Sequence, residues 1–155
     1  PGIPSVYYGS EWGIEGARTK TSDDMLRPAI HSEESPLRDC PLTGYISQLA
    51  HIHAGHSEFH GGRYQELLLT NRQYAFARFA QGSAVITAVN NDSQEVSLQV
   101  PVPMNASSAV DLFTGREFSV SDHRLSVTLA PNRGLMIKIK EDDIYGKDQG
   151  NEEQR

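Results

Sequence analysis

The stretch LSVTLAPNRGLMIKI, Leu125 to Ile139, contains two runs in which large apolar residues occupy every second position. Successive side chains of a β-strand point to opposite faces of a sheet, so each run predicts a strand with one buried face. The residues between the runs, Pro131 to Gly134, have the composition of a turn. This stretch therefore indicates all-β structure in the second half of the chain.

The same alternation recurs upstream, where Val96, Leu98 and Val100 are separated by polar residues. Further predicted strands are Tyr74–Phe79, Val85–Val89 and Val110–Phe113, and turn residues cluster at Asn90–Ser93, Thr114–Arg116 and Ser121–His123. We expect about seven or eight short antiparallel strands in a two-sheet β-sandwich, because that arrangement buries one face of each strand.

The first part of the chain, up to Gly62, contains loops and two predicted elements. Ile3 to Tyr8 has strand composition, and its apolar residues at successive positions suit a strand covered on both faces, as in a parallel sheet. Apolar residues three or four positions apart predict an amphipathic helix from Leu42 to Ala54 that stops near Gly55.

The amino-acid composition excludes several classes of function for this chain. Hydrophobic residues make up 37% of the 155 residues and the net charge is −6, which excludes the basic footprint of a nucleic-acid binder. No apolar run approaches the roughly 20 residues of a membrane-spanning helix. Cys40 is the only cysteine, so an intramolecular disulfide is excluded, and the composition favours a soluble, cytoplasmic protein. The acidic tail, 141–155, is predicted to be solvated and partly disordered.

Several stretches, taken in order, resemble the α-amylase family, family 13 of the glycoside hydrolases. GIPSVYYGSE, WGIEG and DDMLRP are similar to its eighth barrel strand and the following loop. LTGYISQLAHIHAGHSEFHGGRYQEL resembles the last barrel helix and the start of domain C, with Gly62, Tyr64 and Leu67 in a G-x-Y-x-x-L motif. YAFARFAQGSAVITAVNND, DLFTG and LAPNRGLMIKI resemble strands of that domain. The resemblance covers Pro1 to Ile139.

The resemblance implies a mainly β chain: a C-terminal antiparallel Greek-key β-sandwich preceded by a remnant βα unit of a (β/α)8 barrel. The implied domains are the last barrel strand, loop and helix in 1–62, the all-β domain in 63–140 and the tail in 141–155. A retaining glycosidase needs two carboxylates about 5 Å apart, and in the family these come from strands that precede the eighth. The chain, which starts without Met, is therefore expected to be an inactive, structural piece of a longer glycosidase, with no catalytic residue of its own.

The resemblance also implies a sugar-binding rim, because in the family the loop after the eighth strand helps to form substrate subsites. The residues expected to contact an α-glucan or maltooligosaccharide are Tyr8, Glu11, Trp12, Asp24 and Arg27. Trp12 could instead pack against the barrel rim. Leu26 stands where several neopullulanase-like members have a second Arg, which leaves the linkage preference open.

Two clusters of titratable residues have an alternative interpretation. Acids in the loop, at positions 11, 15, 23 and 24, could in principle form a carboxylate pair, but we interpret them as separate loop acids. Four histidines suggest a metal site, and two of them are spaced as on a helix face; they are His51, His53, His56 and His60. Because Gly55 is expected to end the helix before the last two, we interpret all four as exposed or locally hydrogen-bonded and predict no metal and no cofactor.

The sequence leaves two other function classes open. An independent carbohydrate-binding module would display aromatic side chains on its surface, whereas the alternating patterns assign the aromatics to the core: Tyr74, Phe76, Phe79, Phe113 and Phe118. An oligomerisation module could pair through Ile3 to Tyr8, because an exposed apolar strand is an edge that invites self-association.

Overall fold

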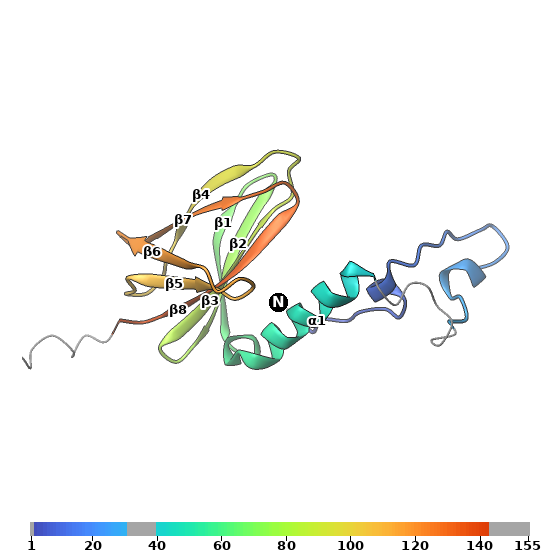
Figure 1. The fold of residues 1–155 in the computed structure, drawn as a ribbon, viewed down its shortest axis with the longest axis horizontal. Coiled ribbons are helices and arrows are strands. Elements are labelled where there is room, and N and C mark those ends of the chain that lie inside the picture. Colours follow the sequence, from blue (N-terminus) through green and yellow to red (C-terminus); the bar gives the residue numbers. More distant parts are fainter. Residues whose placement is uncertain (1, 31–39, 143–155) are drawn as a thin grey trace, which may run out of the picture. The chain divides into compact units, whose positions relative to one another are not determined.

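The computed structural model describes residues 2–30 and 40–142, which form two compact units, Pro1–Gly55 and His56–Arg155 (Figure 1). The division falls earlier than the one expected after Gly62, because the short 3-10 helix Ser57–Phe59 contacts strands of the second unit. Most of the predicted acidic tail, 143–155, lies outside the described residues.

The second unit is all-β, as predicted. Its strands are β1 Arg63–Leu69, β2 Gln73–Ala80, β3 Ser83–Asn90, β4 Val96–Pro101, β5 Ser108–Asp111, β6 Glu117–Ser121, β7 Arg124–Leu129 and β8 Arg133–Lys140. They form one antiparallel sheet in the order β1-β2-β3-β8-β5-β6-β7-β4 (Figure 1). The expectation of seven or eight antiparallel strands is confirmed.

The connections include a Greek key. The strands β5, β6 and β7 follow one another as hairpin-connected neighbours, and β4 lies beside β7 although a long connection joins it to β5. The two strands of the stretch Leu125–Ile139 are not paired with each other, because β7 pairs with β4 and β6 while β8 pairs with β3 and β5. The turn between them therefore carries the chain from one layer to the other.

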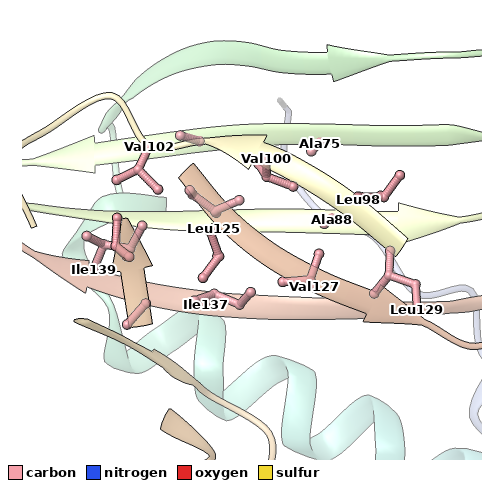
Figure 2. Packing of buried hydrophobic residues seen from close by; sticks show 14 residues of the cluster. Ala75, Ala88, Leu98, Val100, Val102, Leu125, Val127, Leu129, Ile137 and Ile139 are labelled. Carbon is pink, nitrogen blue, oxygen red and sulfur yellow. The ribbon is translucent and has the colours of Figure 1, made fainter. Parts of the chain in front are cut away.

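The continuous sheet folds over at β6 to make the two layers of a sandwich. Only two residue pairs join β6 to β7, Val120 with Leu125 and Ser121 with Arg124. Figure 2 shows side chains of β4 and β7 packed over those of β2, β3 and β8; the labelled residues of these strands are Ala75, Ala88, Leu98, Val100, Leu125, Val127, Leu129, Ile137 and Ile139. Full burial of each large aliphatic side chain contributes about 1.5–3 kcal/mol.

Two buried polar residues hold the ends of strands in place. The Asn90 side chain donates from Nδ2 to the carbonyl of Gln94 at 2.8 Å and to the carbonyl of Ala130 at 3.2 Å, which links the end of β3 to the turn after β7. Asp111 accepts a hydrogen bond from the Thr114 hydroxyl at 2.5 Å and one from the Phe113 amide at 3.2 Å. The polar groups in both family-like motifs, NND and DLFTG, therefore stabilise turns.

Two of the aromatic residues assigned to the core are on the other face of their strand. The core cluster contains Ala75 and Ala77 of β2, so Tyr74 and Phe76 point away from it. Their rings lie 5.7 Å apart between centroids, and the Tyr64 ring lies 5.5 Å from Phe76. The assignment of Tyr74 and Phe76 to the core was wrong, because alternation marks two faces without saying which one is buried.

The first unit contains the predicted helix. The helix α1 spans Pro41–Gly55, which confirms the expected Leu42 to Ala54 within one residue at each end. Pro41 suits the first helical position because the amide it lacks would have no partner in the helix there. Among the described residues, no helix combines the length and apolarity that crossing a membrane requires.

The predicted strand Ile3 to Tyr8 is wrong, since residues 2 to 7 have no regular secondary structure. Ile3 is 96% exposed and Val6 56% exposed. A strand needs a neighbour to accept and donate its backbone hydrogen bonds, and the described residues of the first unit, 2–30 and 40–55, contain no other strand. The composition of this segment is that of a strand, but the partner is missing.

Candidate functional site

A hollow of about 460 Å³ lies in the first unit, between the segment around Tyr8 and the segment that ends at Pro28. It is lined by Tyr7, Tyr8, Ser10, Ile14, Gly16, Met25, Leu26, Arg27 and Pro28. The lining combines aromatic rings, hydroxyls and a guanidinium, which are the groups that stack on sugar rings and bind sugar hydroxyls. None of these described lining residues carries a carboxylate.

Glycines bring the two segments of the hollow together. Gly9 and Gly13 have φ angles of +86° and +67°, in the left-handed region that favours glycine, and they flank the 3-10 helix Ser10–Trp12. A Cβ atom at Gly16 would lie 2.1 Å from the carbonyl oxygen of Met25. Only glycine therefore lets the two backbones approach this closely, and the two walls of the hollow depend on it.

The tyrosines of the hollow form a pair. The rings of Tyr7 and Tyr8 are 4.7 Å apart between centroids and tilted by 43°. Partial desolvation raises the pKa of the Tyr8 phenol, the hydrogen bond with Tyr7 raises it further, and the positive charge of Arg27 opposes both effects. At neutral pH the Tyr8 hydroxyl is thus a neutral hydrogen-bonding group near a cation, which suits recognition of a sugar hydroxyl.

The predicted site residues divide into two groups. Tyr8 and Arg27 line the same hollow, whereas Glu11, Trp12 and Asp24 are not among its lining residues. Glu11 instead accepts a hydrogen bond at its carbonyl from the Thr43 hydroxyl of α1, at 2.6 Å.

Trp12 is half-buried in the 3-10 helix Ser10–Trp12, and Asp24 is exposed at the start of the 3-10 helix Asp24–Leu26. Sequence reasoning missed Tyr7, although it lies directly beside a residue that was selected.

The loop acids also have local roles. The Asp23 carboxylate accepts a hydrogen bond from Arg18 Nε at 2.9 Å, with both side chains exposed, so the pair contributes little stability. The amide of Asp24 donates to the Ser22 hydroxyl at 3.0 Å, within a turn that Thr19 also closes. These contacts agree with the interpretation of the acids as separate loop residues.

A buried carboxylate lies in the second unit, where sequence reasoning did not look for one. Glu58 is fully buried, and its Oε1 accepts hydrogen bonds from Ser83 and from the ammonium of Lys138 on β8. Burial alone would raise the pKa of Glu58, but the hydrogen bonds from Lys138 and Ser83 outweigh it and hold the pKa below its usual value. Since a buried charge is costly unless paired, this cluster is a structural clip between residues 57–59 and the sheet.

Two further residues, His56 and Gly62, lie close to the Glu58 clip. Burial lowers the pKa of His56, the charge of Lys138 lowers it further, and Glu58 opposes both. A Cβ atom at Gly62 would lie 2.2 Å from the carbonyl oxygen of Glu58 and 2.3 Å from that of Phe79, so only glycine fits there. The Gly62 of the G-x-Y-x-x-L motif is therefore explained by close backbone packing. A lysine within the alternating run of β8 was the sequence signal that could have pointed to a buried acid.

Within residues 2–30 and 40–142, no three His, Cys, Asp or Glu side chains are grouped as metal ligands. His51 hydrogen-bonds through Nδ1 to the Ser47 carbonyl at 2.7 Å, one turn earlier in α1. The helix ends at Gly55, before His56 and His60, as predicted. The spacing of these two histidines therefore does not place them on one helix face.

Residues 64–134 match the family described as maltogenic amylase, C-terminal domain. The chain contains an α-amylase family C-terminal domain. Domain C, as we call His56–Lys140 from here on, is the β-sandwich described above.

Curated relatives extend the similarity to most of the chain. Neopullulanase 2 of Thermoactinomyces vulgaris is 31% identical over 88% of this chain and 23% of its own length. The cyclomaltodextrinase of Thermoanaerobacter pseudethanolicus is 27% identical over 88% of this chain and 22% of its own length. The chain thus spans less than a quarter of either relative.

The fold agrees with solved structures. The α-amylase of Geobacillus thermoleovorans, solved in complex with acarbose, superposes with a TM-score of 0.77 at 18% identity, covering 92% of this chain and 31% of that one. A cyclomaltodextrinase structure gives a TM-score of 0.76 over 87% of this chain. At such identities the match supports the fold, which is that of an amylase domain C.

Proposed function

We propose that this chain is the C-terminal portion of an α-amylase-type glycosidase that acts on α-glucosidic linkages in starch and maltooligosaccharides, and that the chain itself is structural. The observation that carries the proposal is the coverage: the chain matches 88% of its own length to neopullulanase 2 but only 23% of that relative. The first unit, Pro1–Gly55, then corresponds to the last unit of a catalytic barrel, and domain C is a stabilising module.

The chemistry agrees with this division. Retaining hydrolysis needs a nucleophile and a general acid, as two carboxylates about 5 Å apart. The buried acid of domain C, Glu58, is paired with Lys138 and hidden from solvent. In the first unit, the Asp23 carboxylate pairs with Arg18, and the Asp24 amide donates to Ser22 within a local turn.

An activity assay tests the proposal. The 155-residue chain and the full product of its gene are incubated with starch, maltoheptaose and a chromogenic α-glucoside, and reducing ends are measured. We expect turnover by the full product and none above the buffer blank by the chain. Turnover by the chain alone would contradict the structural role, and an inactive full product would contradict the glycosidase assignment.

Within this proposal, the hollow around Tyr8 and Arg27 contributes a sugar subsite to the active-site rim, and Glu11, Trp12 and Asp24 lie near it in the assembled enzyme. Arg27→Met and Tyr8→Phe in the full product are expected to raise the KM for maltoheptaose with a smaller change in kcat. Thr19→Val is the control, because Thr19 closes a turn of the same loop without lining the hollow. If this variant changes KM and kcat to the same extent, the effect comes from loop folding.

Self-association through the first segment is a second candidate role, favoured by the exposed side chains of Ile3, Val6 and Tyr7. Light scattering of the chain with and without residues 1–16 tests it, since an unchanged mass removes the idea. A cytoplasmic location stays a prediction and is tested by fractionating cells that express the full gene.

A further inference from the structure

The turn that follows Tyr8 is held by the helix α1 as well as by its own backbone. The Thr43 hydroxyl of α1 donates to the main-chain carbonyl of Glu11 at 2.6 Å, across 32 positions of the sequence. Both residues are half-buried and belong to the first unit. The 3-10 helix Ser10–Trp12 and α1 are in contact around this bond. The hydrogen bond therefore connects an irregular turn to a regular element.

The Glu11 carbonyl differs from its neighbours in its partner. The carbonyls of Tyr7, Gly9 and Ser10 accept hydrogen bonds from backbone amides of the same turn, at 3.0 to 3.2 Å. The Glu11 carbonyl accepts the Thr43 hydroxyl instead. Replacing that hydroxyl by a methyl group would take the donor away from a half-buried carbonyl, and the turn would have to shift to regain a partner.

The position of Thr43 in α1 makes its hydroxyl a fixed donor. Thr43 lies in the first turn of the helix, and its amide donates to the Cys40 carbonyl at 3.0 Å. Threonine is β-branched, so its side chain has few rotamers in a helix. A helical Thr hydroxyl often bonds a carbonyl three or four positions earlier, whereas this one donates to a segment outside the helix. The helix thus presents the hydroxyl at a nearly constant place.

The anchored carbonyl lies in the middle of the segment that forms one wall of the hollow. Tyr8 and Ser10 precede it and Ile14 follows it, and all three line the hollow. The glycines that flank the short helix, Gly9 and Gly13, give the turn little rigidity of its own. A shift at the centre of the turn would therefore carry Tyr8 and Ser10 with it.

The opposite wall of the hollow has a separate anchor. Residues 25–28 form this wall, and Gly16 packs against it so closely that a Cβ atom there would lie 2.1 Å from the Met25 carbonyl oxygen. That contact joins two parts of the loop to each other, whereas the Thr43 hydrogen bond joins the loop to α1. The two anchors act on different walls, so the loss of one should leave the other in place.

We propose that Thr43 is a positioning residue for the sugar subsite. Its hydroxyl holds the turn through the Glu11 carbonyl, and the turn places Tyr8 and Ser10 where they bind hydroxyls of an α-glucan. Thr43 is not among the residues that line the hollow, so it acts through the turn and not by touching the sugar. Glu11 then contributes through its main chain. This inference rests on the proposed function.

Kinetics of three variants of the full gene product test this role. Thr43→Val removes the hydroxyl but keeps the β-branched shape, and Thr43→Ser keeps the hydroxyl. Ser47→Ala is the matched control, because Ser47 is exposed one turn later in α1 and its hydroxyl contacts His51 of the same helix at 3.5 Å. Thr43→Val should raise the KM for maltoheptaose about threefold to tenfold, the effect of one hydrogen bond, with kcat changed less than about twofold. The other two variants should keep the native KM within about twofold.

Hydrogen exchange gives a readout that does not need activity. The amides of Trp12 and Gly13 close the turn by donating to the carbonyls of Gly9 and Ser10. In the full product, Thr43→Val should speed the exchange of a peptide covering residues 8–14 about threefold or more, because the turn opens more often. A peptide covering residues 23–28 should be unchanged, since Gly16 anchors that segment. Ser47→Ala should leave both peptides unchanged.

The outcomes separate the two hypotheses. Native KM and native exchange in Thr43→Val, in a full product that hydrolyses starch, overturn the positioning role and leave the proposed function intact. Faster exchange without a change in KM also overturns it, because the turn then does not place sugar contacts. Equal changes in KM and kcat that Thr43→Ser does not rescue assign Thr43 a structural role and overturn the proposal. A full product that hydrolyses none of the substrates overturns the glycosidase assignment, and faster exchange in Thr43→Val then still supports Thr43 as the anchor of the turn.

Discussion

The two outer faces of the sandwich come from strands with the same alternating pattern, but they differ in chemistry. On β4 and β7 the positions between core residues are Ser97, Gln99, Ser126 and Thr128. On β2, β3 and β8 the corresponding positions include Tyr74, Phe76, Val89 and Met136. The polar side chains of β4 and β7 hydrogen-bond to one another across the strands, whereas the buried Thr87 hydroxyl on the other layer has no hydrogen-bond partner among the described residues. The same alternating pattern therefore gives a polar outer face on one layer and a largely apolar one on the other.

The largest effect is expected at the clip formed by Glu58, Ser83 and Lys138. Lys138→Met leaves the Glu58 carboxylate buried with only Ser83 as a partner. Removing one member of a buried ion pair costs about 3–5 kcal/mol, so the free energy of unfolding in urea should fall by that amount. Lys140→Met is the matched control, because Lys140 is exposed at the end of the same strand; a similar loss there would contradict the role of the clip.

The next largest effect is expected in the hydrophobic core that both layers share. Leu125 of β7 is fully buried, and Leu125→Ala should lower the free energy of unfolding by about 2–5 kcal/mol through lost burial and a cavity. The neighbouring Ser126 points to solvent, and Ser126→Ala should change the free energy of unfolding by less than about 1 kcal/mol. Chemical denaturation of the two variants measures both, and equal effects would mean that β7 is turned the other way.

The clip also predicts a pH dependence. The folded-state pKa of Glu58 lies below its ordinary value of 4.5, so the unfolded state binds a proton more readily. The stabilisation is therefore present above about pH 4.5 and is lost as the pH falls through the folded-state pKa. Unfolding free energies measured from pH 7 to pH 3 should decline more steeply for the native chain than for Glu58→Gln. Parallel curves would assign the acid sensitivity to other carboxylates.

The smallest effect is expected on the polar outer face. Ser97→Ala removes one exposed hydrogen bond to Thr128, worth about 0.2–1 kcal/mol in cross-strand pairs. Thermal melting of the 155-residue chain should change only slightly. A loss comparable with that of Leu125→Ala would show that this face is buried, which would remove the contrast between the layers.

Local sequence patterns located the elements that depend only on neighbouring residues in the chain. Strands with the pattern of Leu125–Leu129 were located correctly because alternation between apolar and polar residues is a local property. The helix Pro41–Gly55 was found for the same reason, from spacing and a glycine stop. The failures concern neighbours: Ile3 to Tyr8 has strand composition without a partner strand, and Tyr74 and Phe76 alternate with alanines on a sheet that is apolar on both sides.

The candidate site was predictable only in part. Tyr8 and Arg27 were selected through resemblance and line one hollow, while Glu11, Trp12 and Asp24 do not line it. The clip at Glu58 escaped detection because its partners, Ser83 and Lys138, are distant in sequence and meet only through the pairing of β3 with β8.

By itself, the sequence determined the all-β class of domain C, the number of its strands, the helix before it and its family, since each depends on local periodicity and ordered motifs. The tertiary structure alone decided that β7 and β8 belong to different layers, that Gly62 must be glycine, and that Glu58 is buried against Lys138. These features depend on which surfaces meet, and contacts between distant residues are set by packing and hydrogen bonding in the folded chain.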